Sequence, residues 1–299
     1  MNFLKYRYFW IAISLIVIIS GVGYGLVTGF KFDIDFMGGT KIQADLKVEF
    51  DNNEIENIVY GIIGTKPLVQ KMSSGQSSVS ITTDVISEEQ STKIVESLKG
   101  KFPNMDEPTT KNIQPSFGKN LIDSSILAII VSMGFILIYV AIRFRTLGFV
   151  AALTALAALA HDVLVIIAFY GIFKLPINST FVAVLLTIIG YSINDTIIVY
   201  DRIRENKRKI TKSTDLADTI NTSLNQTMTR TINTSLTVLV SIVVVLIYAQ
   251  IYDQQVLKEF ALPLTIGLVA GSYSSIFIAS SLWYMFDGIK LKKSKAKAK

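Results

Sequence analysis

The sequence predicts a polytopic α-helical membrane protein, with six transmembrane helices and a small ferredoxin-like α+β domain outside the membrane between helices 1 and 2. Three observations predict this fold class. Of the 299 residues, 51% are hydrophobic and only 17% are charged, too few charges for a soluble protein of this size. Six stretches approach or exceed the roughly 20 apolar residues that cross a bilayer core about 30 Å thick. A polar segment, residues 31–120, separates the first of these stretches from the others.

The six apolar stretches are residues 9–29, 121–142, 147–173, 179–200, 231–249 and 263–286. The first is too long for the core of a signal peptide and lacks a clear small-residue cleavage site, so we expect a retained anchor. The sequence contains no cysteine, which excludes a disulfide framework and thiol catalysis.

Lysine and arginine are unevenly distributed over the short segments that flank these stretches. If the N-terminus is cytoplasmic, the cytoplasmic flanks hold sixteen basic residues, and the opposite short loops hold only Lys174 and Lys258. Basic residues favour the cytoplasmic side, so both termini are predicted to be cytoplasmic. We therefore divide the chain into a cytoplasmic N-terminus with helix 1 (1–30), an extracytoplasmic domain (31–120), helices 2–6 (121–286) and a basic cytoplasmic tail (287–299).

The net charge of +6 originates on the cytoplasmic side, because residues 30–120 hold 13 acidic and 10 basic residues. The tail at 290–299 is a run of lysines, and such a run beside a membrane interacts with anionic lipid headgroups. We therefore expect no nucleic-acid partner.

The extracytoplasmic segment contains signals for both strands and helices. Residues 41–50 alternate between apolar and polar side chains, as in a half-buried strand, and residues 53–64 have apolar side chains at helical spacing. Residues 87–102 open with Ser-Glu-Glu-Gln, the pattern of a capping box. Short extended runs lie at 67–72, 78–83 and 109–115. The resulting order, β-α-β-β-α-β, is that of a ferredoxin-like unit.

Two aspartates, Asp33 and Asp35, follow the first apolar stretch. Such a pair could serve as two catalytic carboxylates, but we expect the side chains to cap the end of the first helix. The segment contains no cluster of metal ligands and no phosphate-binding loop.

Costly polar residues lie within or at the start of three of the apolar stretches: His161 and Asp162 in the third, Asn194 and Asp195 in the fourth, and Arg230 at the start of the fifth. A charged side chain near the bilayer centre costs about 2.5–3.5 kcal/mol or more, so each one needs a partner or a function. At a rise of about 1.5 Å per residue, Asp195 and Arg230 lie about 24 and 28 Å below the outer boundary, and an arginine can bridge that difference.

These five residues, Asp195, Arg230, His161, Asp162 and Asn194, are therefore the candidates for a proton relay. Its centre is Asp195, a buried carboxylate that alternates between protonated and ionised forms. Burial favours the protonated form and a nearby arginine favours the ionised form, so movement of Arg230 would change the proton affinity. The alternative is a static ion pair that fixes the helix register. His161, the only histidine, is either a relay member or a hydrogen-bonded packing residue.

Polar side chains also follow two helical faces. Thr187, Tyr191 and Asp195 share a face of the fourth stretch. The face on the fifth stretch comprises Arg230, Asn233, Thr234, Thr237 and Ser241. Together the two faces predict a partly hydrated seam from the middle of the membrane to the cytoplasm.

Two further patterns concern packing. Residues 213–229 place Leu216, Ile220 and Leu224 on one side, which predicts an amphipathic helix on the cytoplasmic surface before the fifth span. Glycines at four-residue spacing predict close helix packing in the first and sixth spans. These glycines are Gly21, Gly25, Gly29, Gly267 and Gly271.

Six short segments, in order along nearly the whole chain, resemble the SecF group of the SecD/SecF family of protein-export membrane proteins. They are FDIDFMGGT (32–40), QPSFG (114–118), HDV (161–163), GYSINDT (190–196), DRIRE (201–205) and NQTMTRT (225–231). The two segments between 190 and 205 are the most specific. The first segment departs from the family's usual Gly-Ile-Asp-Phe-Thr-Gly-Gly at Asp33 and Met37, but it keeps the Gly-Gly turn.

The resemblance implies one half of a resistance-nodulation-division fold and use of the proton-motive force through Asp195 and Arg230. It also implies an auxiliary, non-enzymatic subunit of the bacterial Sec protein translocase in the cytoplasmic (inner) membrane. The partners it implies are a SecD-like membrane subunit, the Sec translocon channel, the exported polypeptide and protons. Catalytic residues, a cofactor and a metal are not expected.

Two other functions stay open from the sequence. A proton-coupled exporter of small molecules or lipids would have larger extracytoplasmic domains with an apolar pocket, and residues 31–120 are too few to form one. A passive scaffold of the translocon would need Asp195 and Arg230 only for stability.

Overall fold

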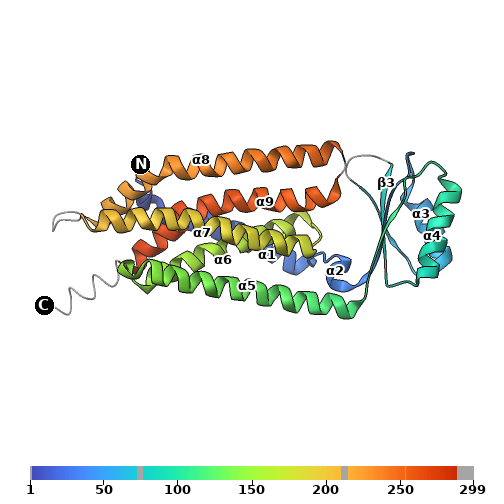
Figure 1. The fold of residues 1–299 in the computed structure, drawn as a ribbon, viewed down its shortest axis with the longest axis horizontal. Coiled ribbons are helices and arrows are strands. Elements are labelled where there is room, and N and C mark those ends of the chain that lie inside the picture. The colour runs from blue at the N-terminus through green and yellow to red at the C-terminus, as the bar shows by residue number, and fades with distance from the viewer. Residues whose placement is uncertain (1, 73–76, 210–214, 253, 288–299) are drawn as a thin grey trace.

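The computed structural model describes residues 2–72, 77–209, 215–252 and 254–287. Within these residues, six helices are long and apolar enough to cross a membrane, which confirms the predicted number. They form one elongated bundle with a small α+β domain at one end, and the first and last described residues lie at the opposite end (Figure 1). We call these two ends of the bundle the domain end and the terminal end. The basic tail at 288–299 lies outside the described residues.

The bundle has a central layer and two peripheral helices. The spanning helices are α1 (Arg7–Thr28), α5 (Pro115–Arg143), α6 (Phe149–Phe173), α7 (Ser179–Lys207), α8 (Leu216–Ile251) and α9 (Gln255–Tyr273). The sixth span continues from α9 through a π-helical segment, η3 (Ser274–Ala279), as far as Asp287. Helices α6, α7 and α9 bury much of their surface within the chain, and α1 buries less. Helices α5 and α8, at opposite edges of the bundle in Figure 1, bury little.

Close contact between the central helices depends on glycine. A Cβ atom at Gly21 on α1 would overlap the Cβ atom and backbone of Ala168 on α6, and one at Gly267 on α9 would overlap Ile188 on α7. Gly29 does not pack in this way: its φ of 79° ends α1, and the space around it is open. The predicted glycine contacts are therefore present except at Gly29.

Helix α8 corrects the expectation of a separate amphipathic helix on the membrane surface. Residues 216–251 form one continuous helix of 36 residues, because neither proline nor glycine interrupts it. Ile220 and Leu224, expected to face the membrane surface, are buried in the main core of the bundle. The side chain of Asn221 accepts hydrogen bonds from the backbone N–H groups of Phe3 and Leu4, at 2.9 and 3.2 Å. The N-terminal part of α8 is thus held by the bundle.

The α+β domain confirms the predicted order of strands and helices. Its elements are β1 (Gly39–Asp45), α3 (Asn52–Ile63), β2 (Leu68–Lys71), β3 (Ser78–Thr83), α4 (Glu88–Lys101) and β4 (Thr109–Ile113). The antiparallel sheet has the order β2-β3-β1-β4, and α3 and α4 cover the face that points away from the bundle (Figure 1). Buried side chains such as Ile42, Ile81 and Ile94 fill the space between the layers.

The local signals in this domain had different outcomes. The capping box at the start of α4 is present, with Ser87 and Gln90 satisfying each other's backbone N–H groups. Strand β1 ends at Asp45, and the prediction that it continues to Phe50 is wrong. Lys47 has a φ of 59°, which a strand does not allow, although Leu46 and Phe50 remain buried as their pattern suggested.

A short helix, α2 (Ile34–Met37), joins the domain to the bundle. Asp33 caps α2 by accepting from the N–H of Ile34. The expectation that Asp33 and Asp35 cap the end of the first helix is wrong. Asp33 caps α2, Asp35 accepts from Lys111 and Ser179, and the end of α1 is bonded by Lys174, which donates to the carbonyl oxygen of Gly29 at 2.6 Å.

Candidate functional site

Two carboxylates are fully enclosed in the middle of the bundle. Asp162 on α6 is 1% exposed and Asp195 on α7 is 0% exposed. Since a charge at this depth is costly, the partners of each carboxylate indicate what it can do.

Asp195 is only partly satisfied by hydrogen bonds. It lies sixteen residues beyond the start of α7, about 24 Å along the helix. Its Oδ2 accepts a long hydrogen bond of 3.4 Å from Ser235 on α8, whose own oxygen accepts from Ser272 on α9 at 2.7 Å. Its Oδ1 is buried and has no hydrogen-bond partner among the described residues. An unpaired carboxylate oxygen in the membrane is free to carry a proton.

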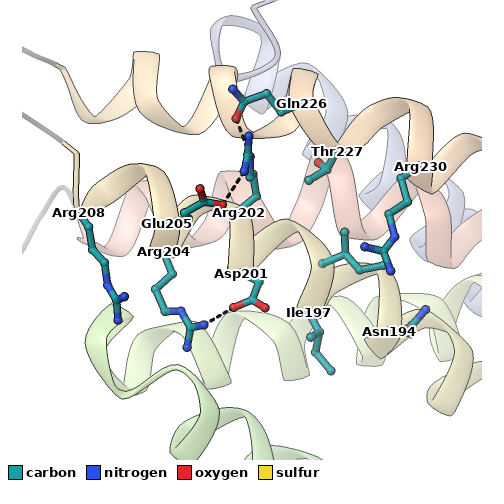
Figure 2. A pocket seen from close by; sticks show the side chains of 11 residues that line it. Asn194, Ile197, Asp201, Arg202, Arg204, Glu205, Arg208, Gln226, Thr227 and Arg230 are labelled. Carbon is teal, nitrogen blue, oxygen red and sulfur yellow. Dashed lines mark hydrogen bonds and ion pairs between the residues drawn. The ribbon is translucent and has the colours of Figure 1, made fainter.

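Arg230 is not paired with Asp195. Within the ranges that the structure describes, the guanidinium makes no ion pair with any carboxylate. Figure 2 shows the side chain extending from α8 toward α7, close to Asn194. Asn194 is exposed and Asp195 is buried, so these neighbours point to different sides of α7.

Arg230 and Asn194 lie at the inner end of a polar cavity of about 600 Å³ between α7 and α8 (Figure 2). Its other lining residues are Ile197, Ile198, Asp201, Arg202, Arg204, Glu205, Arg208, Gln226 and Thr227. Arg204 pairs with Asp201 at 2.6 Å, and Arg202 bonds both Glu205 and Gln226. The cavity extends from the terminal end to the residue beside Asp195, and a polar space of this size can hold water.

Asp162, in contrast, has several partners. Its Oδ1 lies 3.0 Å from Nδ1 of His161, and its Oδ2 accepts from Ser192 at 2.6 Å and from Ser274 at 2.9 Å. These partners hold the carboxylate between α6, α7 and the π-helical segment η3. The arrangement resembles a structural polar cluster more closely than an open proton acceptor.

The two ring nitrogens of His161 have different surroundings. Its Nδ1 faces Asp162, but its Nε2 is buried without a hydrogen-bond partner in the described chain. The ring stacks on Tyr273 at a centroid distance of 6.0 Å and lines an apolar cavity of about 430 Å³ between α1, α6 and α9. The structure therefore brings His161 and Asp162 together, but it opens His161 toward a separate cavity.

Hydroxyl groups that were not predicted from the sequence surround the two carboxylates. Ser235 and Ser272 lead to Asp195, whereas Ser192 and Ser274 bond Asp162. The run of serines in the sixth span is a signal for this cluster, because serine in an apolar span usually faces a helix partner. A π-helix, which is frequent at functional sites, begins within the run.

The residues of the predicted seam do not form one continuous polar surface: some face the interior of the bundle and others face outward. On α8, Ser235 turns toward Asp195, whereas Asn233, Thr237 and Ser241 are exposed on the outside of the helix. On α7, Thr187 is exposed and Asp195 is buried. Within the described residues, no group of three His, Cys, Asp or Glu side chains is placed to hold a metal ion.

Comparison with known proteins relates most of this architecture to one family. The family profile "Protein export membrane protein SecD/SecF, C-terminal" matches residues 93–288. The protein translocase subunit SecF of Rickettsia bellii is 34% identical over 98% of this chain and 94% of its own length. The protein translocase subunit SecDF of Bacillus subtilis is also 34% identical over 98% of this chain, but the chain spans only 39% of that relative.

A solved structure has the same fold. The crystal structure of SecDF from Thermus thermophilus, described as a translocon-associated membrane protein, superimposes with a TM-score of 0.83 at 30% sequence identity. The match covers 96% of this chain and 39% of that one.

Proposed function

Since the chain belongs to the SecD/SecF family of protein-export membrane proteins, as a SecF-type subunit of a protein translocase, we propose that it uses the proton-motive force to promote export. Its role is non-enzymatic: protons pass through the bundle and drive a change of conformation. One observation supports this most strongly. The buried carboxylate of Asp195 has an oxygen without a hydrogen-bond partner among the described residues, and Arg230, which makes no ion pair there, lines a polar cavity that ends at the neighbouring residue Asn194.

The proposed cycle has two states of Asp195. An ionised carboxylate needs a nearby cation at this depth, and Arg230 is long enough to supply it. A protonated carboxyl group needs none, which suits the arrangement with Arg230 turned toward Asn194 (Figure 2). Protons exchange through the cavity between α7 and α8, and Arg230 moves between its two positions as Asp195 gains and loses a proton.

The available energy is sufficient for such a cycle. One elementary charge that crosses 100 mV releases about 2.3 kcal/mol. Shifting a two-state equilibrium from 1:99 to 99:1 requires about 5.5 kcal/mol. Two or three protons per cycle therefore suffice.

The outer surface of α7 and α8 supports a SecD-like membrane subunit as the partner. Exposed small and polar residues follow one stripe of α7, and α8 exposes further polar residues beside it. The residues on α7 are Ala183, Thr187, Gly190 and Asn194; those on α8 are Asn233, Thr237 and Ser241. Lipid solvates such side chains poorly, but another helix can pack against small residues and bond the polar ones. The Sec translocon channel and the exported polypeptide are the further partners that we propose.

We also propose that the terminal end of the bundle faces the cytoplasm of a bacterium and that the α+β domain lies outside the cytoplasmic membrane. The chain has no cysteine, so single cysteines report on sidedness directly. In intact cells, a membrane-impermeant maleimide is expected to label Tyr60→Cys on α3 and to leave Lys209→Cys unlabelled until the membrane is opened. Labelling of both positions from outside would contradict this orientation.

One experiment tests export and partnership together. Inside-out membrane vesicles are prepared with and without an affinity-tagged chain, and export is measured with the proton gradient intact and after a protonophore. The chain is expected to add only to the gradient-dependent rate and to capture a SecD-like subunit on purification. An equal gradient-dependent rate without the chain, or a fully active monomer, would contradict the proposal.

A further inference from the structure

A third enclosed carboxylate lies at the junction between the α+β domain and the bundle. Asp35 on α2 is 3% exposed. One of its oxygens accepts from Nζ of Lys111 on β4 at 2.7 Å. The other accepts from both the backbone N–H and the hydroxyl group of Ser179, the first residue of α7, with the N–H at 3.0 Å. One side chain thus joins the sheet of the domain to the start of the helix that carries Asp195.

The start of α7 is a favourable position for this carboxylate. The first backbone N–H groups of a helix have no partner within the helix, and the helix dipole places a partial positive charge there. Asn178, the residue directly before α7, caps the helix by accepting from the N–H of Phe181 at 3.1 Å. Asp35 adds a second cap from a distant segment, and its negative charge is stabilised by both the helix and Lys111.

Backbone hydrogen bonds also connect the segment before Asp35 to the loop at the start of α7. The N–H of Asp33 donates to the carbonyl oxygen of Ile177 at 2.9 Å, and the N–H of Ile177 donates to that of Lys31 at 2.8 Å. The chain that leaves α1 therefore pairs with the loop that leads into α7.

Close packing holds α2 from the other side. A Cβ atom at Gly118, in the first turn of α5, would lie 2.5 Å from the carbonyl oxygen of Phe36 on α2. The backbones of α2 and α5 therefore pack closely, and a side chain at position 118 would push them apart.

We propose that Asp35 is a positioning residue that couples α7 to the α+β domain. Together with Lys111 and Ser179 it forms a latch, and this latch makes the domain follow the displacement of α7. Because Asp195 lies on the same helix, about 24 Å from the latch, a change at Asp195 is transmitted along a rigid element to the domain. The inference rests on the proposed function of Asp195 and adds the residue through which that function reaches the exported side.

The latch transmits a proton-linked change without being the group that senses protons. Burial alone would raise the pKa of Asp35, but the hydrogen bonds from Lys111 and Ser179 outweigh it and hold the pKa below the ordinary value of 3.8. The stabilisation by a carboxylate of this kind is complete above the ordinary pKa and is lost only as the pH falls through the lower, folded-state pKa. The charged groups around the junction include Lys111 on β4, the Asp33–Lys41 pair between α2 and β1, and Glu259 on α9, which accepts from Asn178 beside Ser179. Above about pH 5, a movement that depends on pH must therefore originate elsewhere.

The test uses the chain in its membrane complex, reconstituted in vesicles. Spin labels at Tyr60→Cys on α3 and Ile251→Cys at the end of α8 measure the distance between domain and bundle at mildly acidic and mildly alkaline pH. In a separate preparation, the alkylation rate of Ile198→Cys reports access to the cavity next to Asp195. We expect both readouts to change with pH in the otherwise unaltered protein and to stop changing in Asp195→Asn.

Asp35→Asn separates the latch from the proton site. It is expected to abolish the pH-dependent change in distance while the pH-dependent alkylation of Ile198→Cys persists. The matched control is Asp45→Asn, which removes a carboxylate that pairs with Lys47 within the domain and should preserve both changes. If Asp35→Asn does not fold, Ser179→Ala and Lys111→Gln each remove one donor and should reduce the change in distance without affecting alkylation.

The remaining outcomes separate the two ideas. A normal change in distance in Asp35→Asn, or in both milder variants, overturns the latch and leaves the proton site intact. If neither readout responds to pH in the unaltered protein, or if Asp195→Asn responds normally, the proposed function fails and the latch fails with it.

Discussion

Replacement of Asp195 by asparagine is expected to abolish the gradient-dependent part of protein export while the protein inserts and folds normally. Asparagine has nearly the same shape and can still accept a hydrogen bond from Ser235, but it cannot release or bind a proton in this pH range. The export rate with a full gradient should therefore fall to the rate measured after a protonophore. Inside-out vesicles that contain equal amounts of each variant provide the measurement.

Asp123→Asn is the matched control for this change. Asp123 also lies in a spanning helix, α5, but it is exposed near the domain end. Its replacement should leave gradient-dependent export unchanged. If Asp195→Asn exports protein at the unaltered rate under a full gradient, the carboxylate is a structural pin and the chain acts as a passive scaffold.

Replacement of Arg230 by methionine is expected to lower the gradient-dependent rate at least about tenfold, because a tenfold effect corresponds to only about 1.4 kcal/mol and a lost counter-charge in the membrane exceeds this. Methionine keeps much of the apolar volume but leaves the ionised form of Asp195 without a cation. Arg230→Lys keeps the charge and loses the planar fork, so its rate should lie between those of the unaltered protein and Arg230→Met.

Arg145→Met serves as the control for the loss of a basic residue at the terminal end. Arg145 is exposed in the short turn between α5 and α6 and does not line the cavity. Its replacement should leave the rate unchanged. A result in which Arg230→Met lowers thermal stability but preserves the full gradient-dependent rate would assign the arginine a structural role only.

The membrane part of the fold was predictable because the energy that determines it is visible in the sequence. An apolar run of about 20 residues is most stable as a helix across the hydrocarbon core of a membrane, so six such runs define six helices. The ends of the helices are not determined by this energy. Helix α8 continues past Arg230 to Leu216 because its backbone is uninterrupted and Ile220 and Leu224 are buried against the bundle. Hydropathy alone ends the span at the first charged residue and misplaces the segment before it.

The charged residues of the candidate site were predictable from the sequence, but not all of its hydroxyl groups were. Asp162, Asp195 and Arg230 are prominent because charge is rare in the membrane. Ser235 is not, since a serine can satisfy its hydroxyl group on its own helix at any position. The junction was hidden for another reason. Asp35 and Ser179 are 144 residues apart, and only the folded chain brings them together.

The pairing of the first and last strands of the domain makes it a modular insertion. Gly39 on β1 and Ile113 on β4 are direct neighbours in the antiparallel sheet. Opposite residues in such a pair lie about 5 Å apart, so a link of one or two residues can replace everything between them. The domain therefore leaves and rejoins the helical bundle at a single point on its surface, and a replacement domain of different size would need a donor at the position of Lys111 to keep the contact with Asp35.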